Sequence, residues 1–361
     1  MIAPQILEKL PIDGVDWCRI DIRTALENRA PKQKYIVGGL PEEKGIYGML
    51  IGPDGARKSW VAAQICVGVA TGTEIAGGLW EAPAKGRVVF FTAEDSADSI
   101  WRRLEALQRN VPDAVLEIWK EDLQHNLDII PLASGESGLT LITQDSNGQP
   151  ARHPHLPKLI QLCQGARLVV LDPLADLLDA EENDGKAARL LVQVLRGISR
   201  ETGAGVLIVH HQNKAAMGSG DKGNQSARGS SKIPAGCRWS VTLQPISEKE
   251  AARLEMTDAH LWTKIHEGKS QYRPPKNMDE DDMALYHYPT VADRDGRLHG
   301  GTPLLTALPK LPKSSADKWE KAEKKWAADA DAYAEKSGRG VTAPRAGKKG
   351  GGQKEEIGDD W

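Results

Sequence analysis

The sequence lacks long hydrophobic runs, clustered cysteines and an excess of charge of either sign. It has no run of eighteen apolar residues and no apolar secretory segment near its start, so we expect a soluble cytoplasmic protein without membrane contact. The four cysteines have neither disulfide nor metal spacing, which favours buried thiols in a reducing compartment. A net charge of −3 excludes a globally basic protein that coats nucleic acid, so any such contact must be local.

Short apolar strands alternate with helical stretches through the middle of the chain. This alternation predicts an α/β fold, a mainly parallel sheet covered by helices, and 361 residues leave room for one large domain or two smaller ones. The predicted strands span residues 46–51, 87–92, 127–132, 168–171, 206–209, 239–243 and 261–265. The predicted helices span residues 58–70, 97–110, 156–164 and 187–202.

The two ends of the chain differ in composition from this core. We expect a capping segment at 1–35 with a short helix at 22–28, then the α/β domain at 36–297. Three prolines predict a linker at 298–314, an Ala/Lys/Glu-rich stretch predicts a helix at 315–336, and residues 337–361 have the composition of a disordered tail. The basic run at 336–354 would add salt-sensitive affinity for DNA, and the acidic end could compete for the same cations or dock on a partner through Trp361. The alternative is a solubilising tail without a role.

A phosphate-binding loop of the G-x-x-x-x-G-K-S type is formed, with one exception, by Gly52, Pro53, Asp54, Gly55, Ala56, Arg57, Lys58 and Ser59. Its backbone N–H groups would close around the phosphates of a nucleoside triphosphate at a helix N-terminus. Lys58 would neutralise the outer phosphates, and Ser59 would offer a hydroxyl to Mg²⁺. Arg57 replaces a glycine that takes a left-handed conformation, at a cost of about 1–2 kcal/mol. A strand-to-helix turn that binds nothing is the alternative.

Two carboxylates follow apolar strands downstream of the loop. Glu94 comes directly after strand 87–92, where it would lie beside the γ-phosphate and deprotonate an attacking water. Alternatively, Glu94 and Asp95 simply begin helix 97–110 as first-turn acids. Asp172 ends strand 168–171 in the Walker B pattern and would hold the Mg²⁺ that Ser59 also touches.

Two histidines and a glycine-containing loop follow the strand at 206–209. His210 and His211 could donate hydrogen bonds to the γ-phosphate, or they could be ordinary residues at the end of a strand. The loop at 212–229 is locally basic, which suits a contact with a nucleic-acid backbone, although it could equally be an ordinary surface loop. The cations of this contact would be Lys214, Lys222 and Arg228.

The ordered set of motifs resembles the RepA-type hexameric replicative helicases of plasmids and phages, which belong to the RecA-like P-loop ATPases. The most specific string is His210-His211-x-x-Lys214-Ala-Ala, then Met217-Gly-x-Gly-Asp221, Ala227-Arg228-Gly229-Ser230-Ser231 and Arg238-Trp239. The likeness covers residues 35–275. The resemblance implies a RecA-like core that uses ATP and Mg²⁺, binds single-stranded DNA, assembles as a homo-oligomer, a hexamer in that family, and works in a bacterial host.

The same resemblance implies individual roles. Lys58 and Ser59 would bind the triphosphate and Mg²⁺, Glu94 would be the catalytic base, and His211 would be the γ-phosphate sensor. Arg238 would be an arginine finger supplied across a subunit interface, which makes hydrolysis depend on ring assembly. Lys269 resembles a second interface cation, with an ordinary surface cation as the alternative. Arg57 departs from the family pattern and puts the rate of hydrolysis in question more than nucleotide binding.

Two rival functions remain open from the sequence. The first is a RecA-like recombinase or recombination mediator that forms filaments instead of rings. The second is a nucleotide-gated DNA-binding scaffold or loader with weak ATPase activity, and Arg57 is the residue that motivates it.

Overall fold

A computed structural model describes residues 7–10, 17–28, 30–133, 138–179, 184–211, 232–253, 255–257, 259–270, 283–289 and 301–307. Residues 1–251 and 256–308 form one compact unit, and the site described below lies in it. The predicted loop at 212–229, the predicted helix at 315–336 and the predicted tail at 337–361 lie outside the described residues.

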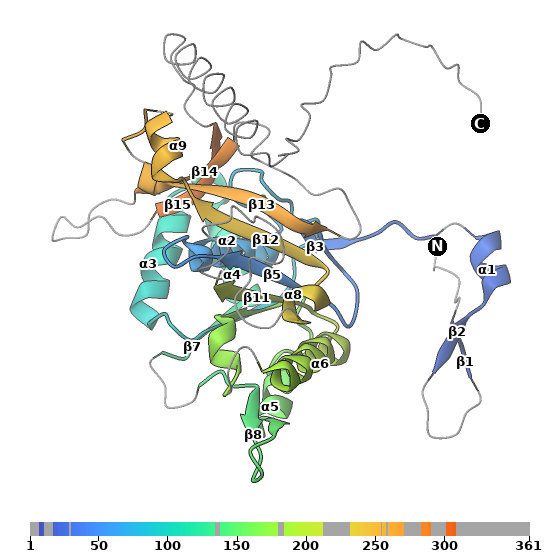
Figure 1. Cartoon of the computed structure of the whole chain (residues 1–361). Coiled ribbons are helices and arrows are strands. Elements are labelled where there is room, and N and C mark those ends of the chain that lie inside the picture. Colours follow the sequence, from blue (N-terminus) through green and yellow to red (C-terminus); the bar gives the residue numbers. More distant parts are fainter. Residues whose placement is uncertain are drawn as a thin grey trace, which may run out of the picture. The chain divides into compact units, whose positions relative to one another are not determined.

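One sheet organises the described part of the chain and contains nine of its strands, in the order β15-β14-β13-β12-β5-β11-β10-β6-β7 (Figure 1). The strands from β12 to β7 run parallel to one another, and β13, β14 and β15 extend the sheet with antiparallel pairing. Their bounds are β5 Tyr47–Gly52, β6 Val88–Thr92, β7 Leu127–Pro131, β10 Leu168–Asp172, β11 Gly205–His211, β12 Trp239–Pro245, β13 Trp262–Ser270, β14 Met283–Pro289 and β15 Gly301–Ala307.

Helices cover both faces of this sheet, because residues along each central strand alternate between two hydrophobic cores (Figure 1). In β10, Leu168 and Val170 belong to one core, whereas Val169 and Leu171 belong to the other. The first core takes in α2 Lys58–Thr71, α3 Ala97–Gln108 and α4 Asp113–Asn126. The second takes in α5 Leu156–Leu162, α6 Gly185–Thr202 and α8 Lys232–Gly236. The result is the predicted α/β fold, a mainly parallel sheet covered by helices on both faces.

All seven predicted strands and all four predicted helices are present, with ends shifted by a few residues. The largest shift is in β13, which continues to Ser270. The sequence analysis missed α4, because its apolar side chains are interleaved with charges and only Trp119 is buried. It also missed the hairpin of β8 Ile142–Gln144 and β9 Pro150–Arg152, the short helices η1 Leu174–Leu177, η3 Ala259–Leu261 and α9 Glu248–Arg253, and the strands β14 and β15.

The predicted linker at 298–314 needs a correction, because β15 occupies residues 301–307 within it. Pro303 lies in this strand and pairs in register with His287 of β14. Proline is tolerated there because β15 is the outermost strand of the sheet in the described residues, where one side of the strand needs no ladder hydrogen bonds.

The first 41 residues contribute small elements. They are the β1 Leu7–Lys9 and β2 Cys18–Ile20 hairpin, α1 Ile22–Glu27, and the pair of β3 Tyr35–Val37 and β4 Leu40–Pro41. The predicted short helix at 22–28 is confirmed as α1, which Asp21 caps by accepting a hydrogen bond from the Thr24 backbone N–H. None of its six residues is buried.

Candidate nucleotide-binding site

The phosphate loop connects the end of β5 to the start of α2. Gly52 ends the strand where a Cβ atom would lie 2.8 Å from the Leu243 carbonyl oxygen, so a side chain does not fit there. Gly55 takes a left-handed conformation with φ +75° in open space. The chain then enters α2 at Lys58, and its first-turn N–H groups face the loop.

Arg57 adopts the left-handed conformation that the sequence predicted for this position. It is the N-cap of α2, with φ 61° and ψ 32°, and its side chain makes no capping hydrogen bond. Its guanidinium instead donates to the carbonyl oxygen of His260 over 3.2 Å. This contact with a segment far away in sequence helps to offset the backbone strain of a non-glycine residue.

Lys58 is buried at the base of the loop. Its ammonium donates to the carbonyl oxygens of Gly52, at 3.0 Å, and Pro53, at 2.9 Å. Burial lowers the pKa of Lys58, and the nearby carboxylates of Asp54, Asp172 and Glu94 oppose that shift. Because burial disfavours the charged ammonium, a bound phosphate group would stabilise it by supplying a negative charge close by.

Asp172 ends β10 and is almost completely buried. The pKa of Asp172 is raised to about 7, mainly by burial and further by the nearby charges of Asp95 and Glu94. A hydrogen bond from Ser59 and the charge of Arg103 oppose this rise. The Oδ2 atom of Asp172 is buried without a hydrogen-bond partner among the described residues. A buried carboxylate with one unused oxygen, next to the Ser59 hydroxyl, fits a divalent cation such as Mg²⁺.

Glu94 follows β6 and stays largely free, with 59% of its side chain exposed. Asp95, the next residue, forms a two-pronged ion pair with Arg103 of α3, in which one bond measures 2.6 Å. Thr92 also donates to the Asp95 carboxylate over 3.4 Å. The Arg103 guanidinium lies 5.6 Å from the centre of the Trp60 ring on α2. Asp95 is therefore fixed by its neighbours, whereas Glu94 can move toward a substrate.

The two histidines at the end of β11 face different surroundings. His210 is buried, whereas His211 lies beside the phosphate loop. The Nδ1 atom of His211 is 2.6 Å from Asp54 Oδ1 and 3.5 Å from Lys58 Nζ, and its Nε2 atom is 3.9 Å from Glu94 Oε1. His211 thus connects the phosphate loop to the segment that carries Glu94.

A single cleft of about 620 Å³ collects these side chains. It brings together predicted site residues that four separate segments supply: Asp54, Gly55, Arg57, Lys58, Ser59, Glu94, Asp172 and His211. Trp60, Arg103 and Ala175 also line it and were missed. Of these three residues, only Arg103 could have been found from the sequence. Asp95 lies just before the predicted helix at 97–110, and an arginine eight residues later lies in its second turn.

Arg238 and Lys269 do not line this cleft. Arg238 precedes β12, and its backbone N–H donates to the carbonyl oxygen of Tyr47, at the start of β5, over 2.9 Å. Five residues of extended strand, about 16 Å, separate that point from Gly52. Lys269 pairs in register with Ser240 of β12 and donates to the Ala235 carbonyl oxygen over 3.0 Å. Both cations therefore lie at the opposite end of the sheet from their own phosphate loop. The predicted nucleic-acid contacts Lys214, Lys222 and Arg228 lie outside the described residues.

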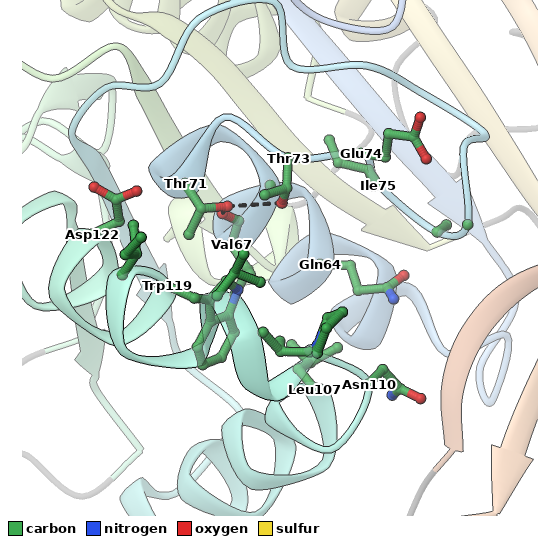
Figure 2. A pocket seen from close by; sticks show the side chains of 17 residues that line it. Gln64, Val67, Thr71, Thr73, Glu74, Ile75, Leu107, Asn110, Trp119 and Asp122 are labelled. Atoms are coloured by element: carbon green, nitrogen blue, oxygen red, sulfur yellow. Dashed lines mark hydrogen bonds between the residues drawn. The ribbon is translucent and has the colours of Figure 1, made fainter.

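A second hollow of similar size, about 640 Å³, contains none of the predicted site residues. Figure 2 shows it between α2 and α4, with Trp119 and Leu107 below and Thr71 and Thr73 above. Its lining is mainly apolar, and the two threonine hydroxyls hydrogen-bond to each other over 2.8 Å. Its charged lining residues, Glu74 and Asp122, are both acidic, so it offers no cation to a triphosphate.

The chain belongs to an AAA domain family, whose match covers residues 19–217. This membership means a nucleotide-binding P-loop domain, which is what the loop and the cleft also indicate. No helix in the described residues has the length and apolar character needed to cross a membrane.

Two solved structures resemble the chain in fold. One is described as an ATPase domain; it has 12% sequence identity and a TM-score of 0.44, and the match covers 71% of this chain and 85% of that one. The other is described as a DnaB-like replicative helicase and its interactions with primase; it has 13% identity and a TM-score of 0.43, over 68% and 56% of the two chains.

Proposed function

We propose that the protein is an ATP-dependent replicative DNA helicase of the RepA type, which moves along single-stranded DNA as a homo-oligomeric ring. The observation that carries the ATPase part is the cleft in which Lys58, Asp172 and Glu94 meet. The helicase part rests on the order of motifs around it and on the basic loop after His211. A bacterial host cell and a plasmid or phage origin belong to the same proposal.

Each side chain of the cleft has a separate task in hydrolysis. Lys58 neutralises the outer phosphates, and the N–H groups at the start of α2 hold their oxygens. Mg²⁺, held by Ser59 and Asp172, would neutralise charge on the transferring phosphoryl group. Glu94 accepts a proton from the attacking water. Asp95 is already paired with Arg103 and does not compete for that proton.

His211 and Arg238 extend this proposal to movement. His211 contacts Asp54 and lies near Lys58, so loss of the γ-phosphate changes its surroundings, and the loop at 212–229 begins directly after it. Arg238 and Lys269 lie too far from their own phosphate loop to act there. We infer that they act at the cleft of a neighbouring subunit, which links hydrolysis to assembly.

The proposal is tested by comparing Lys58→Ala with Glu94→Gln. We expect Lys58→Ala to abolish nucleotide binding, because it removes ground-state charge. Glu94→Gln should leave binding intact and reduce turnover on the order of 10²–10⁴-fold, because its carboxylate acts only on the water. Binding is measured with a fluorescent ATP analogue, and turnover is measured with and without single-stranded DNA. Unchanged turnover in Glu94→Gln would disprove the role of the base.

One observation favours a second candidate, a nucleotide-gated scaffold or loader that hydrolyses ATP slowly. Arg57 holds a left-handed conformation where a glycine would be unstrained, and its side chain is attached to His260. Strong ATP binding with negligible turnover, unaffected by DNA, would favour this candidate over the helicase. Filaments instead of rings in electron micrographs of the ATP-bound protein on DNA would favour a recombinase.

A further inference from the structure

Two hollows lie along the surface of α6 and meet at Gln193, which lines both. The first, of about 350 Å³, lies between the N-terminal half of α6, the β8–β9 hairpin and the start of α8. The second, of about 530 Å³, lies between the C-terminal half of α6, β9 and α5. We call the two together the α6 groove. None of its lining residues belongs to the nucleotide cleft.

The α6 groove is strongly basic in a protein with a net charge of −3. Its lining includes five exposed cations, Arg152, Lys186, Arg189, Arg200 and Lys232, and a single carboxylate, that of Glu201. Within the described part of the chain, Arg152, Arg189 and Arg200 form no ion pair with a carboxylate, and Lys186 donates to the neutral amide oxygen of Gln149 over 3.1 Å. Most of this charge is thus available to a bound anion.

The cations follow the helix instead of converging on one point. Lys186, Arg189, Gln193 and Arg200 recur at spacings of three, four and seven, so they lie on one face of α6. From Lys186 to Arg200 the helix rises about 21 Å. A row of this length cannot be filled by one small anion, but it matches a linear polyanion.

The position of the α6 groove relates it to the predicted DNA loop. Lys232 lines the groove and follows immediately after residues 212–231, the segment that contains the predicted contacts Lys214, Lys222 and Arg228. One cation of the groove, Lys232, therefore continues along the chain the local positive charge of that loop.

We propose that the α6 groove binds the sugar-phosphate backbone of single-stranded nucleic acid and extends the contact made by the 212–229 loop. This inference rests on the proposed function, because it assumes that the strand reaches that loop. Arginine guanidinium groups bind phosphate oxygens in a two-pronged manner, and they do so without reading the base. The groove supplies affinity without sequence preference.

The test compares two double variants of the full-length protein that remove the same charge. Arg189→Gln/Arg200→Gln removes two cations of the groove, and Arg102→Gln/Arg253→Gln removes two exposed arginines from α3 and α9, which line neither hollow. Binding of a labelled oligo-dT is measured by fluorescence anisotropy between about 50 and 200 mM salt, conditions in which about 0.7 counterions are released per neutralised phosphate.

We expect the groove variant to bind more weakly at low salt, with a log–log salt slope about 1.4 smaller than that of the wild type, because two phosphate contacts are lost. The control variant should keep the wild-type slope. Equal slopes for the groove and control variants would overturn the proposal.

A variant that adds charge controls for misfolding. Gln193→Lys places a cation where the two hollows meet, and it should steepen the slope by about 0.7 and tighten binding. A misfolded protein cannot give this result, and an unchanged slope would count against the groove.

Two further readouts separate the groove from the helicase function and from a peptide site. If the wild type binds oligo-dT with a groove-dependent slope but hydrolyses no ATP, the proposed helicase function fails and the groove stands. If DNA-stimulated hydrolysis is normal and both double variants share one slope, only the groove fails.

The competing occupant of the groove is an acidic peptide, which is tested with a labelled peptide of residues 355–361. If it binds the wild type and is lost in the groove variant while the oligo-dT slopes are equal, the groove is a peptide site and the proposal is overturned.

Discussion

Arg57 is the residue at which the phosphate loop departs from its usual composition. The structure keeps it in the left-handed conformation that a glycine would adopt, and the His260 carbonyl oxygen accepts a hydrogen bond from its guanidinium. The side chain thus has a structural contact and also lines the nucleotide cleft. The effect of Arg57 on catalysis depends on whether its backbone strain or its side chain in the cleft matters more.

We expect Arg57→Gly to keep or increase the ATPase rate, because the change relieves backbone strain of about 1–2 kcal/mol. Gly55→Ala is the matched control, since Gly55 has φ +75° and a Cβ atom there would meet nothing within 4 Å. It should introduce only strain and lower the thermal midpoint. The two variants are compared by calorimetry and by steady-state hydrolysis. A collapse of activity in Arg57→Gly would mean that Arg57 binds phosphate itself.

At the scale of elements, the Arg103–Asp95 pair joins α3 to the turn that carries Glu94, and Trp60 brings α2 into the same cluster. The side chains of Arg103 and Asp95 are 15% and 14% exposed, so the pair is shielded from solvent more than an ordinary surface ion pair is. The backbone N–H of Ala93 also donates to the Asp172 carbonyl oxygen over 2.8 Å. The turn is therefore held on both sides of Glu94.

Arg103→Lys should lower kcat by about 10- to 100-fold with little change in KM, because a lysine cannot make the two-pronged contact and the position of Glu94 relaxes. The control is Arg109→Lys on the same side of the sheet, where the arginine that caps α3 pairs with the exposed Glu105. It should leave both constants unchanged. A rise in KM with unchanged kcat would show that Arg103 binds the nucleotide instead of positioning Glu94.

At the scale of the whole molecule, the separation of Arg238 from its own phosphate loop predicts catalysis across subunits. Arg238→Ala and Lys58→Ala should each be inactive alone. Mixing them should restore activity at sites that take an intact Lys58 from one parent and an intact Arg238 from the other. ATPase activity is followed as a function of the mixing ratio, with co-assembly checked by size-exclusion chromatography. Co-assembly without recovered activity would place Arg238 within its own subunit or in a structural role.

Burial of three thiols makes a second prediction at this scale. Cys18 is exposed, whereas Cys66, Cys163 and Cys237 are buried. Burial raises the pKa of Cys163 to about 12 and that of Cys66 well above its usual value. Raised values favour the neutral thiol in the folded state. Because the thiols ionise near pH 9 once unfolded, the free energy of unfolding falls from about pH 9 toward pH 12.

The loss should amount to at most about 1.4 kcal/mol per pH unit for each group. It is measured by urea unfolding between about pH 8 and 10, the range around the usual thiol pKa. Cys163→Ala should make the dependence on pH shallower, and one thiol per native chain should react with a disulfide reagent. Rapid reaction of all four thiols would contradict their burial.

The sequence by itself determined the features that depend on neighbouring residues. The phosphate loop, the carboxylates at the ends of β6 and β10 and the alternation of strands and helices could all be predicted, because each is a local pattern of residue type and spacing. The left-handed conformation of Arg57 followed from the pattern in the same way. Where local patterns were weak, as in α4, or contained proline, as in β15, the prediction was incomplete or wrong.

Only the tertiary structure decided which distant residues meet. The contact of Arg57 with His260 and the two hollows along α6 each join segments that the sequence does not relate. The position of Arg238 at the far end of β5 was also hidden, because it follows from the parallel register of β12 with β5. Strand order and register arise from packing across the sheet, and a local pattern does not contain that information.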